Sequence, residues 1–353
     1  EQFDGIALAP LSVTTEQVEQ AKLALTEKRL QAIKTAYGQI KRFHSAQSPQ
    51  DIFVETCPGV RCTLKTEAIE SVGLYIPAGS APLPSTVLML GVPAQLAGCK
   101  RTVLVCPPDK NGQLANEILV AASLCDITEI YTIGGAQAIA ALAFGTASIP
   151  AVHKVFGPGN RYVTEAKKQL SQQVAGFAID MPAGPSEVLV IGDEQANAAF
   201  IAADLLSQAE HGVDSQVILL TDSKKLIKDV SIELDKQIAL LSRREIAQQA
   251  LKQSRLILTK DMAQAAEVSN NYGPEHLIVQ TDNAQELLKD LRNAGSIFVG
   301  PYTPESAGDY ASGTNHVLPT YGYSKVIPSL SLADFSRRYT CILNPTDAAD
   351  PDE

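Results

Sequence analysis

A glutamate and a histidine stand side by side after a Gly-Pro turn, in the segment Gly273-Pro274-Glu275-His276. Histidine titrates near neutral pH, and a neighbouring carboxylate or metal ion can tune it as a general base. The same pair would also fit an exposed charge pair, which contributes little to stability. We take Glu275 and His276 as candidate catalytic residues.

Two further segments carry side chains of the kinds that bind metal ions. Gln208 and His211 are three residues apart at the end of a predicted helix, so they project from one helical face, although His211 before Gly212 would equally fit a helix C-cap. Asp309 and His316 lie in a segment rich in Gly and Ser. Imidazole and oxygen ligands of this kind can form a zinc site with room for a substrate. No Cys-x-x-Cys pair is present, which disfavours a structural zinc site.

Two glycine turns follow apolar runs and open predicted helices. They are Gly134-Gly135-Ala136-Gln137 and Gly157-Pro158-Gly159-Asn160. Free backbone N–H groups at a helix N-terminus suit a phosphate or another anion. Neither turn has the full G-x-G-x-x-G pattern of dinucleotide-binding folds, and plain tight turns explain each one about as well.

Short β-branched runs alternate with amphipathic runs of helical length. Strands are predicted at 72–76, 102–106, 129–133, 152–156, 187–191, 216–220, 256–258, 276–279 and 296–299. Helices are predicted at 84–97, 114–124, 136–143 and 162–170, with further helices between the later strands. This alternation indicates an α/β protein with mostly parallel sheets. Because the rhythm restarts near residue 187, we expect two Rossmann-like domains.

The remaining segments are less regular. Residues 14–45 have helical periodicity, which predicts one long or broken N-terminal helical segment. Residues 51–64 read as short strands around a turn at Pro58-Gly59. Residues 302–330 are rich in Gly, Ser, Thr and Pro without clear periodicity, and long stretches of this type are often functional. Residues 344–353 have the composition of a disordered tail.

Charge and cysteine content limit the classes of function. With 29 basic and 39 acidic residues the net charge is −10, which argues against nucleic-acid binding. No apolar run is long enough to predict a membrane span. The six cysteines are scattered, which favours buried free thiols and a reducing cytoplasm over a disulfide framework.

The combination of these motifs resembles the histidinol dehydrogenase family. The likeness extends from about Gly59 to Phe335, and seven specific blocks carry it in order. They are Val72–Pro77 with Gly79-Ser80-Ala81-Pro82, Gly134–Gly145, Phe156–Asn160, Asp180–Leu189, Leu205–Gly212, Tyr272–Leu277 and Pro304–Gly322.

The resemblance implies an activity and a set of roles. The activity is the oxidation of L-histidinol through L-histidinal to L-histidine, with two NAD reduced, by an aldehyde-dehydrogenase-like fold that forms a homodimer with a shared active site. Glu275 and His276 match the catalytic pair. Gln208, His211 and Asp309 match ligands of Zn²⁺. The substrate contacts would be Ser186, Gln208, His211, His276, Asp309 and His316, and the NAD contacts Tyr75, Gln137 and Asn160.

The resemblance also suggests domain boundaries. We expect residues 75–186 to form the NAD-binding domain. Residues 1–74 and 187–335 would form the substrate and zinc domain with the N-terminal helical segment, and residues 336–353 a divergent tail.

At both ends the sequence departs from the family pattern. The N-terminal arm is mostly missing, and no counterpart follows Arg338 for the C-terminal segment that carries a substrate-binding Glu and a fourth zinc ligand, His. If this were the whole protein, we would expect weak zinc binding and low turnover. One alternative is therefore a catalytically impaired paralogue that binds NAD or an imidazole ligand. Another is a zinc hydrolase with Glu275 as the base for metal-bound water.

Overall fold

The computed structural model describes residues 11–77, 82–181, 184–310 and 312–343. The predicted tail at 344–353 and most of the Gly79–Pro82 block lie outside these residues. Within them, no helix is long and apolar enough to cross a membrane. All six cysteines are free; Cys106 and Cys125 are buried, whereas Cys57 and Cys341 are exposed, contrary to the expectation that all would be buried.

The chain folds as two compact units. Unit 1 comprises Glu1–Gly157, Gln173–Asp180 and Ser331–Glu353, and unit 2 comprises Pro158–Gln172 and Met181–Leu330. This division corrects the boundaries expected from the sequence, which assigned residues 1–74 to the second domain. The N-terminal helices and the strand at 71–75 belong to unit 1, because they pack within its own layers.

Unit 1 contains a five-stranded parallel sheet. Its strands are β3 (Ser71–Tyr75), β4 (Arg101–Val105), β5 (Glu129–Tyr131), β6 (Lys154–Phe156) and β7 (Ala178–Ile179), in the spatial order β5-β4-β3-β6-β7. The helices α3 (Pro84–Ala97), α4 (Asn116–Leu124) and α5 (Gly135–Phe144) connect successive strands of this sheet. The central strand β3 is buried along its whole length, as expected for a parallel strand covered on both faces.

The N-terminal segment is a broken helix, as predicted. Helix α1 (Thr15–Ala24) begins with a capping box at Thr14, and α2 (Glu27–Ser45) begins at its own cap, Thr26. Helix α2 buries Ile33 and Ile40 and packs on α3 and α4, while α1 packs on α4. These apolar contacts attach the segment to unit 1.

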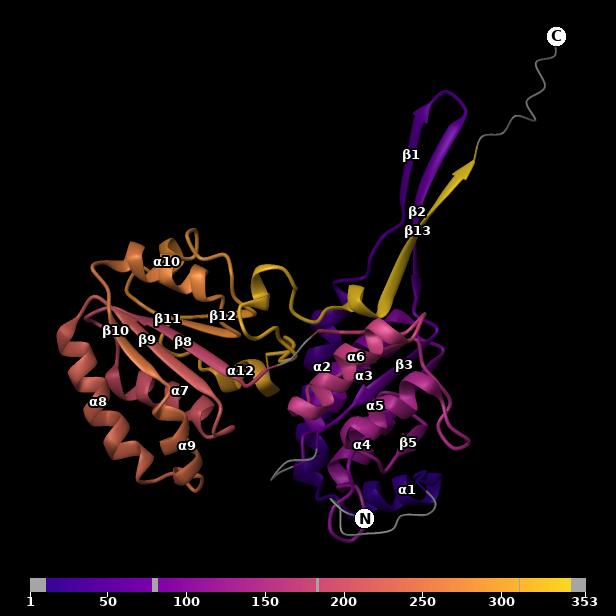
Figure 1. The fold of residues 1–353 in the computed structure, drawn as a ribbon, viewed down its shortest axis with the longest axis horizontal. Coiled ribbons are helices and arrows are strands. Elements are labelled where there is room, and N and C mark those ends of the chain that lie inside the picture. The colour runs from indigo at the N-terminus through magenta and orange to yellow at the C-terminus, as the bar shows by residue number, and fades with distance from the viewer. Residues whose placement is uncertain (1–10, 78–81, 182–183, 311, 344–353) are drawn as a thin grey trace, which may run out of the picture. The chain divides into compact units, whose positions relative to one another are not determined.

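Three antiparallel strands form a second sheet in unit 1, and they run side by side in Figure 1. The strands are β1 (Ile52–Cys57), β2 (Val60–Ala68) and β13 (Ser336–Leu343). The turn at Pro58-Gly59 joins β1 to β2, as predicted. The region expected to be a divergent tail instead begins with β13, which pairs with β2 along its whole length.

Unit 2 contains the second five-stranded parallel sheet. Its strands are β8 (Glu187–Gly192), β9 (Gln216–Thr221), β10 (Arg255–Leu258), β11 (His276–Gln280) and β12 (Ser296–Val299), in the order β10-β9-β8-β11-β12. The helices of this part of the chain are α6 (Arg161–Gln173), α7 (Ala198–Ala209), α8 (Lys224–Ile238), α9 (Arg244–Leu251), α10 (Met262–Tyr272), α11 (Ala284–Leu287) and α12 (Glu305–Tyr310).

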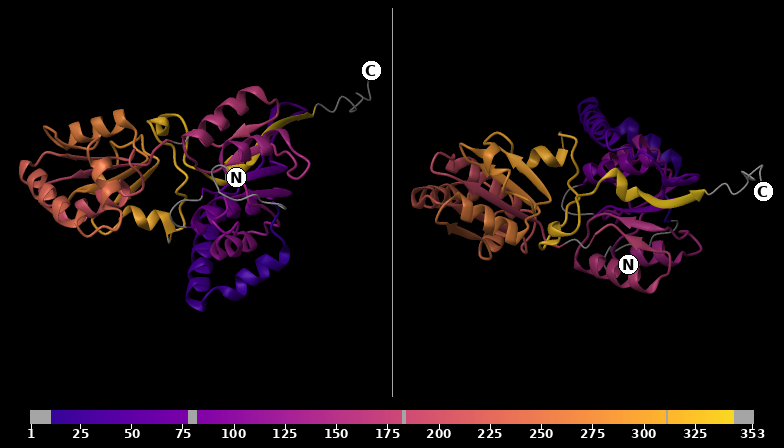
Figure 2. Two further views of the ribbon diagram at one scale, coloured as in Figure 1. Left: turned by 60° about the horizontal axis from the view of Figure 1, so that its bottom comes forward. Right: turned by 90° about the horizontal axis from the view of Figure 1, so that it is seen from above.

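Helices cover both faces of the second sheet (Figures 1 and 2). Alternate residues of β8 face opposite sides, because side chains alternate along a strand. Val188 and Val190 pack with Leu205 of α7 in one core layer, whereas Leu189 and Ile191 belong to the other layer. The α/β class with two parallel-sheet domains and an N-terminal helical segment is thereby confirmed.

Candidate active site

The predicted catalytic pair stands where one of two neighbouring parallel strands begins. Strands β8 and β11 are adjacent, with His276 opposite Val188, so Glu275 and Glu187 stand at the amino edge of the sheet. Ser186, the predicted substrate contact, directly precedes β8. Gly273 ends α10 with a φ of 71°, which lets the chain reverse into β11.

His276 is held in a defined tautomer. Its Nδ1 lies 3.0 Å from the carbonyl oxygen of Glu187, and because a carbonyl only accepts, Nδ1 carries the hydrogen. In the neutral ring Nε2 is then unprotonated and can accept a proton. Burial lowers the pKa of His276 to about 4, and the ring is only 5% exposed. His276 is therefore a neutral base at physiological pH.

Glu275 is buried beside this ring. Its Oε2 accepts a hydrogen bond from the backbone N–H of Glu187 at 2.8 Å and lies 3.6 Å from Nδ1 of His276. Burial raises the pKa of Glu275 well above its usual range, and the charges of Glu305, Glu187 and Asp309 raise it further. Once ionised, such a carboxylate is a stronger base than an exposed one.

Gln208 and His211 lie at the end of α7, near the same edge of the sheet. Gln208 is in the last turn and is 1% exposed. His211 follows the helix, is exposed, and its Nδ1 lies 2.8 Å from the carbonyl oxygen of Ser207. That contact places the hydrogen on Nδ1 and leaves Nε2 available, which is the arrangement common among metal-binding histidines.

The short helix α12 supplies Asp309 and a residue that the sequence analysis missed, Glu305. The two acids are four residues apart and share one helical face. Glu305 is 2% exposed, and burial, with the nearby charges of Asp309 and Asp204, raises its pKa to about 9. The spacing of the two acids was the available signal, but residues 302–330 were read as irregular.

Asp309 pairs with His316. Its Oδ1 lies 3.6 Å from Nδ1 of His316. Burial alone would raise the pKa of Asp309, but the hydrogen bond and charge of His316, with His276 and His211, outweigh burial and hold this pKa below its ordinary value. Asp309 is therefore an anion at neutral pH, as a metal ligand must be.

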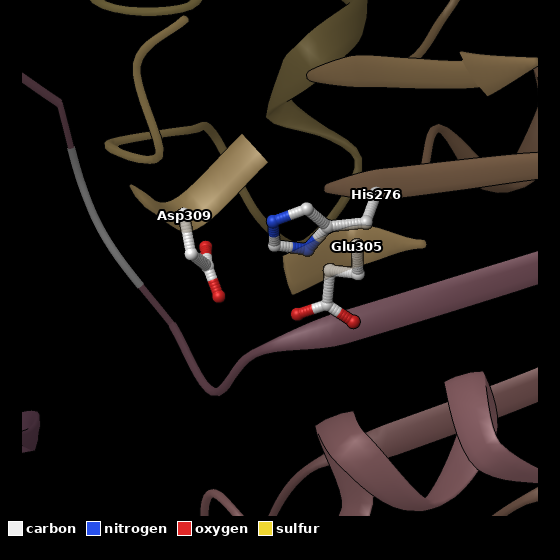
Figure 3. Close-up of side chains that lie close together, drawn as sticks. All are labelled: His276, Glu305 and Asp309. Carbon is white, nitrogen blue, oxygen red and sulfur yellow. The ribbon is translucent and has the colours of Figure 1, made fainter. Parts of the chain in front are cut away.

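His276, Glu305 and Asp309 converge on one point (Figure 3). One potential ligand atom from each lies within 4.8 Å of the others. A divalent cation suits this donor set and would offset the mutual repulsion of its carboxylates. This cluster shares only Asp309 with the predicted zinc set. Of the other two, Gln208 contacts Glu305, and His211 is close enough to affect the pKa values of His276 and Asp309.

The predicted NAD contacts are divided between the two units. In unit 1, the hydroxyl of Tyr75, at the carboxyl end of β3, accepts a hydrogen bond from the N–H of Gly135 at 3.1 Å. Gly135 has a φ of 70°, and a Cβ there would lie 2.8 Å from Oε1 of Gln137. Asn160, in unit 2, accepts hydrogen bonds at its side-chain oxygen Oδ1 from the N–H groups of Tyr162 and Val163, so this side chain caps the start of α6.

Comparison with known proteins identifies the family. A family model for histidinol dehydrogenase matches residues 1–350. The chain belongs to the histidinol dehydrogenase family. A histidinol dehydrogenase from Colwellia psychrerythraea is 79% identical over 99% of this chain and 83% of that protein, and one from Idiomarina loihiensis is 60% identical over 96% and 77%.

Solved structures agree with the family assignment. The crystal structure of histidinol dehydrogenase from Elizabethkingia anophelis superimposes with a TM-score of 0.94 and 47% identity, covering 97% of this chain and 79% of that one. An acetylating aldehyde dehydrogenase from Geobacillus thermoglucosidasius shares the fold with a TM-score of 0.55 at 12% identity, covering 92% of this chain and 94% of that one.

Membership of the histidinol dehydrogenase family confirms the resemblance drawn from the sequence. It places the chain among the oxidoreductases of histidine biosynthesis that act on an alcohol or aldehyde. It does not favour the alternative of an impaired paralogue, and the hydrolase alternative does not fit an oxidoreductase.

Proposed function

We propose that the chain oxidises L-histidinol through L-histidinal to L-histidine with NAD, at a zinc site formed by Gln208, His211 and Asp309. The observation that carries the proposal is the buried, neutral His276, which has a ring nitrogen within 4.8 Å of carboxyl oxygens of Glu305 and Asp309. A proton acceptor beside a cation site is what alcohol oxidation requires, because the hydroxyl must lose its proton as the carbon loses hydride.

The donor set fits zinc. Asp309 is ionised, His211 has an available Nε2, and Gln208 has an amide oxygen. Together they would make an open site of nitrogen and oxygen ligands. Zinc bound there would supply Lewis-acid polarisation and a template for a substrate with imidazole and amine nitrogens. Ser186 and His316 are proposed as further substrate contacts, because Ser186 precedes β8 and His316 pairs with Asp309.

NAD, the second cofactor, would supply the hydride acceptor. We assign its contacts to Tyr75, Gln137 and Asn160. The turn that Tyr75 holds opens α5, whose cap residue Gly134 offers no side chain to its first N–H groups. Such a helix start suits the phosphates of a dinucleotide. A Cβ at Gly157 would lie 2.1 Å from the carbonyl oxygen of Tyr75, so only glycine permits this close approach of β3 and the turn after β6.

The two oxidations use the catalytic pair differently. In the first, Nε2 of His276 takes the hydroxyl proton of the alcohol. In the second, the carboxylate of Glu275 takes a proton from the water that adds to the aldehyde, and His276 takes the hydroxyl proton of the resulting hydrate. The two steps together consume one water and deliver two hydrides, so the product is a carboxylate.

We also propose that the protein is a homodimer with a shared active site and acts in the cytoplasm. The support for an interface is the sheet of β1, β2 and β13, which exposes apolar side chains. Val54, Cys62 and Ile342 lie opposite one another across its three strands, with 50% of Val54 and 72% of Ile342 exposed. Exposed apolar surface of this kind is typical of interaction sites.

The decisive test measures NADH from L-histidinol with purified protein supplied with zinc and NAD. We expect two NADH for each histidinol consumed, and none after chelation of the metal. Glu275→Gln should release one NADH per histidinol and accumulate an aldehyde that hydroxylamine traps. Histidinol bound without NADH formation would contradict the proposal.

A further inference from the structure

Glu305 is a buried carboxyl of the described site that no proposed step uses. It lies in the first turn of α12, and its hydrogen-bonding neighbours are on α7. Ser207 donates from Oγ to Oε2 at 3.5 Å, and the amide of Gln208 faces the same carboxyl group. Glu305 therefore contacts the side chain of Gln208, which the proposed function takes as a zinc ligand.

An amide side chain has two ends of nearly the same shape but opposite chemistry. If the oxygen of Gln208 faced Glu305, the amide could donate a hydrogen bond to neither of the carboxyl oxygens. With its nitrogen turned toward Glu305, the amide donates to both carboxylate oxygens, and the distance to Oε2 is 3.0 Å. The amide oxygen then has no part in this contact and is available to a cation or substrate.

The alternative orientation would harm the site. Zinc binds oxygen and not the amide nitrogen of a glutamine, so a rotated amide would present two hydrogens to the cation. Gln208 is 1% exposed, so water does not compensate for a wrong orientation. The two oxygens of the Glu305 carboxyl group face the amide of Gln208, and the amide nitrogen is the end that can donate to both of them.

We propose that Glu305 is a positioning residue that fixes the amide of Gln208 with its oxygen available to zinc and substrate. The inference rests on the proposed function only in taking Gln208 as a metal ligand. It differs from a direct role for Glu305, which its distance to His276 and Asp309 would also permit. A positioning residue acts through Gln208, whereas a ligand acts by itself.

A double-mutant cycle separates the two roles, with Co²⁺ as the probe. Its affinity is measured by titration and its coordination by visible absorption, for the unchanged protein, Glu305→Gln, Gln208→Ala and the double variant. We expect Glu305→Gln to weaken Co²⁺ binding about tenfold and to shift the absorption bands. In the Gln208→Ala background the same substitution should change affinity less than twofold and leave the bands in place.

Equal weakening by Glu305→Gln in both backgrounds would overturn the proposal, because Glu305 would then bind or attract the cation independently. Asp214→Asn, which removes an exposed carboxylate three residues after His211, is the charge control and should leave the bands unchanged. If Glu305→Gln does not fold, Glu305→Asp keeps the charge and moves the carboxyl by one methylene; it should still shift the bands only when Gln208 is present. Co²⁺ binding needs no histidinol, so an inactive protein with a coupled cycle would refute the proposed function alone.

Discussion

The two parallel sheets share one topology but differ in where polar chemistry gathers. In both, the first strand lies at the centre, the next two follow on one side and the last two on the other. In unit 1 the proposed NAD residue Tyr75 stands at the carboxyl end of β3, where open α/β sheets usually bind ligands. In unit 2 Glu275 and His276 stand at the amino end of β11. The fold predicts the first location, and only residue chemistry reveals the second.

The helices that follow the first strands show the same contrast. Helix α3 in unit 1 carries no charged residue, and ten of its residues are buried. Its counterpart α7 in unit 2 carries Asp204 and Gln208 on its buried face. The second unit thus has buried polar groups on the helix that ends at the site. Burying such groups lowers the stability of the folded state unless they are hydrogen-bonded. We infer that the second unit is less stable because of the polar groups that its catalytic site requires, whereas the corresponding helix of the first unit has no charged residue.

The largest effect should come from His276. His276→Asn removes the proton acceptor, so kcat for histidinol should fall by about 10²–10⁴-fold with little change in KM. Because burial lowers the pKa of His276 to about 4, the base is unprotonated above that pH, and the acidic limb of kcat/KM should lie well below the ordinary histidine value. Steady-state kinetics across pH measure both.

His153→Asn is the matched control for this prediction. His153 bonds to Ser71 in unit 1, outside the proposed site, so kcat should stay within twofold of the original. A fall in kcat below tenfold for His276→Asn would show that the amino edge of the second sheet does not supply the base.

An intermediate effect is expected at Tyr75. Tyr75→Phe removes the oxygen that accepts a hydrogen bond from the N–H of Gly135, and the loss of this bond should weaken NAD binding by about 1 kcal/mol. The Kd for NAD should therefore rise roughly three- to tenfold, while kcat at saturating NAD stays within twofold. Isothermal titration with NAD measures the change. Tyr131→Phe, at the end of β5 in the same sheet, is the control. A rise in histidinol KM equal to that for NAD would show that Tyr75 does not act on NAD binding alone.

Sequence periodicity predicted the strands of both parallel sheets except the two-residue β7, because runs such as residues 188–192 are continuously apolar and only a doubly covered sheet buries them. It could not reveal β13, which pairs with β2 about 270 residues earlier and has no local signature. The domain boundary failed for a similar reason: α2 attaches to α3 through tertiary contacts that sequence order does not report.

The sequence predicted those site residues that belong to a recognisable motif. It did not predict those that belong to the site only because of how the chain packs. Glu275 and His276 stood out as a pair, whereas Glu305 looked like one acid in a Gly-Ser segment. What distinguishes Glu305 is its burial against α7, and burial follows from the fold of residues far away in the chain. Asp204 escaped notice in the same way, in a helix whose other residues before Ser207 are all apolar.

The smallest effect concerns stability at Asp204. Burial raises the pKa of Asp204 to about 6, so the folded state disfavours its charged form. The contribution of the protonated group to stability is fully present below the unfolded pKa near 4 and is lost as the pH rises through 6. Asp204→Asn keeps an acceptor for Gln280 and should raise the unfolding free energy at pH 8 by about 1–3 kcal/mol, with a smaller gain at pH 5. Urea denaturation at both pH values measures this. The control is Asp235→Asn, at an exposed position, which should change the unfolding free energy equally at both pH values. An equal gain at both pH values for Asp204→Asn would mean that the charge of Asp204 is not what destabilises this unit.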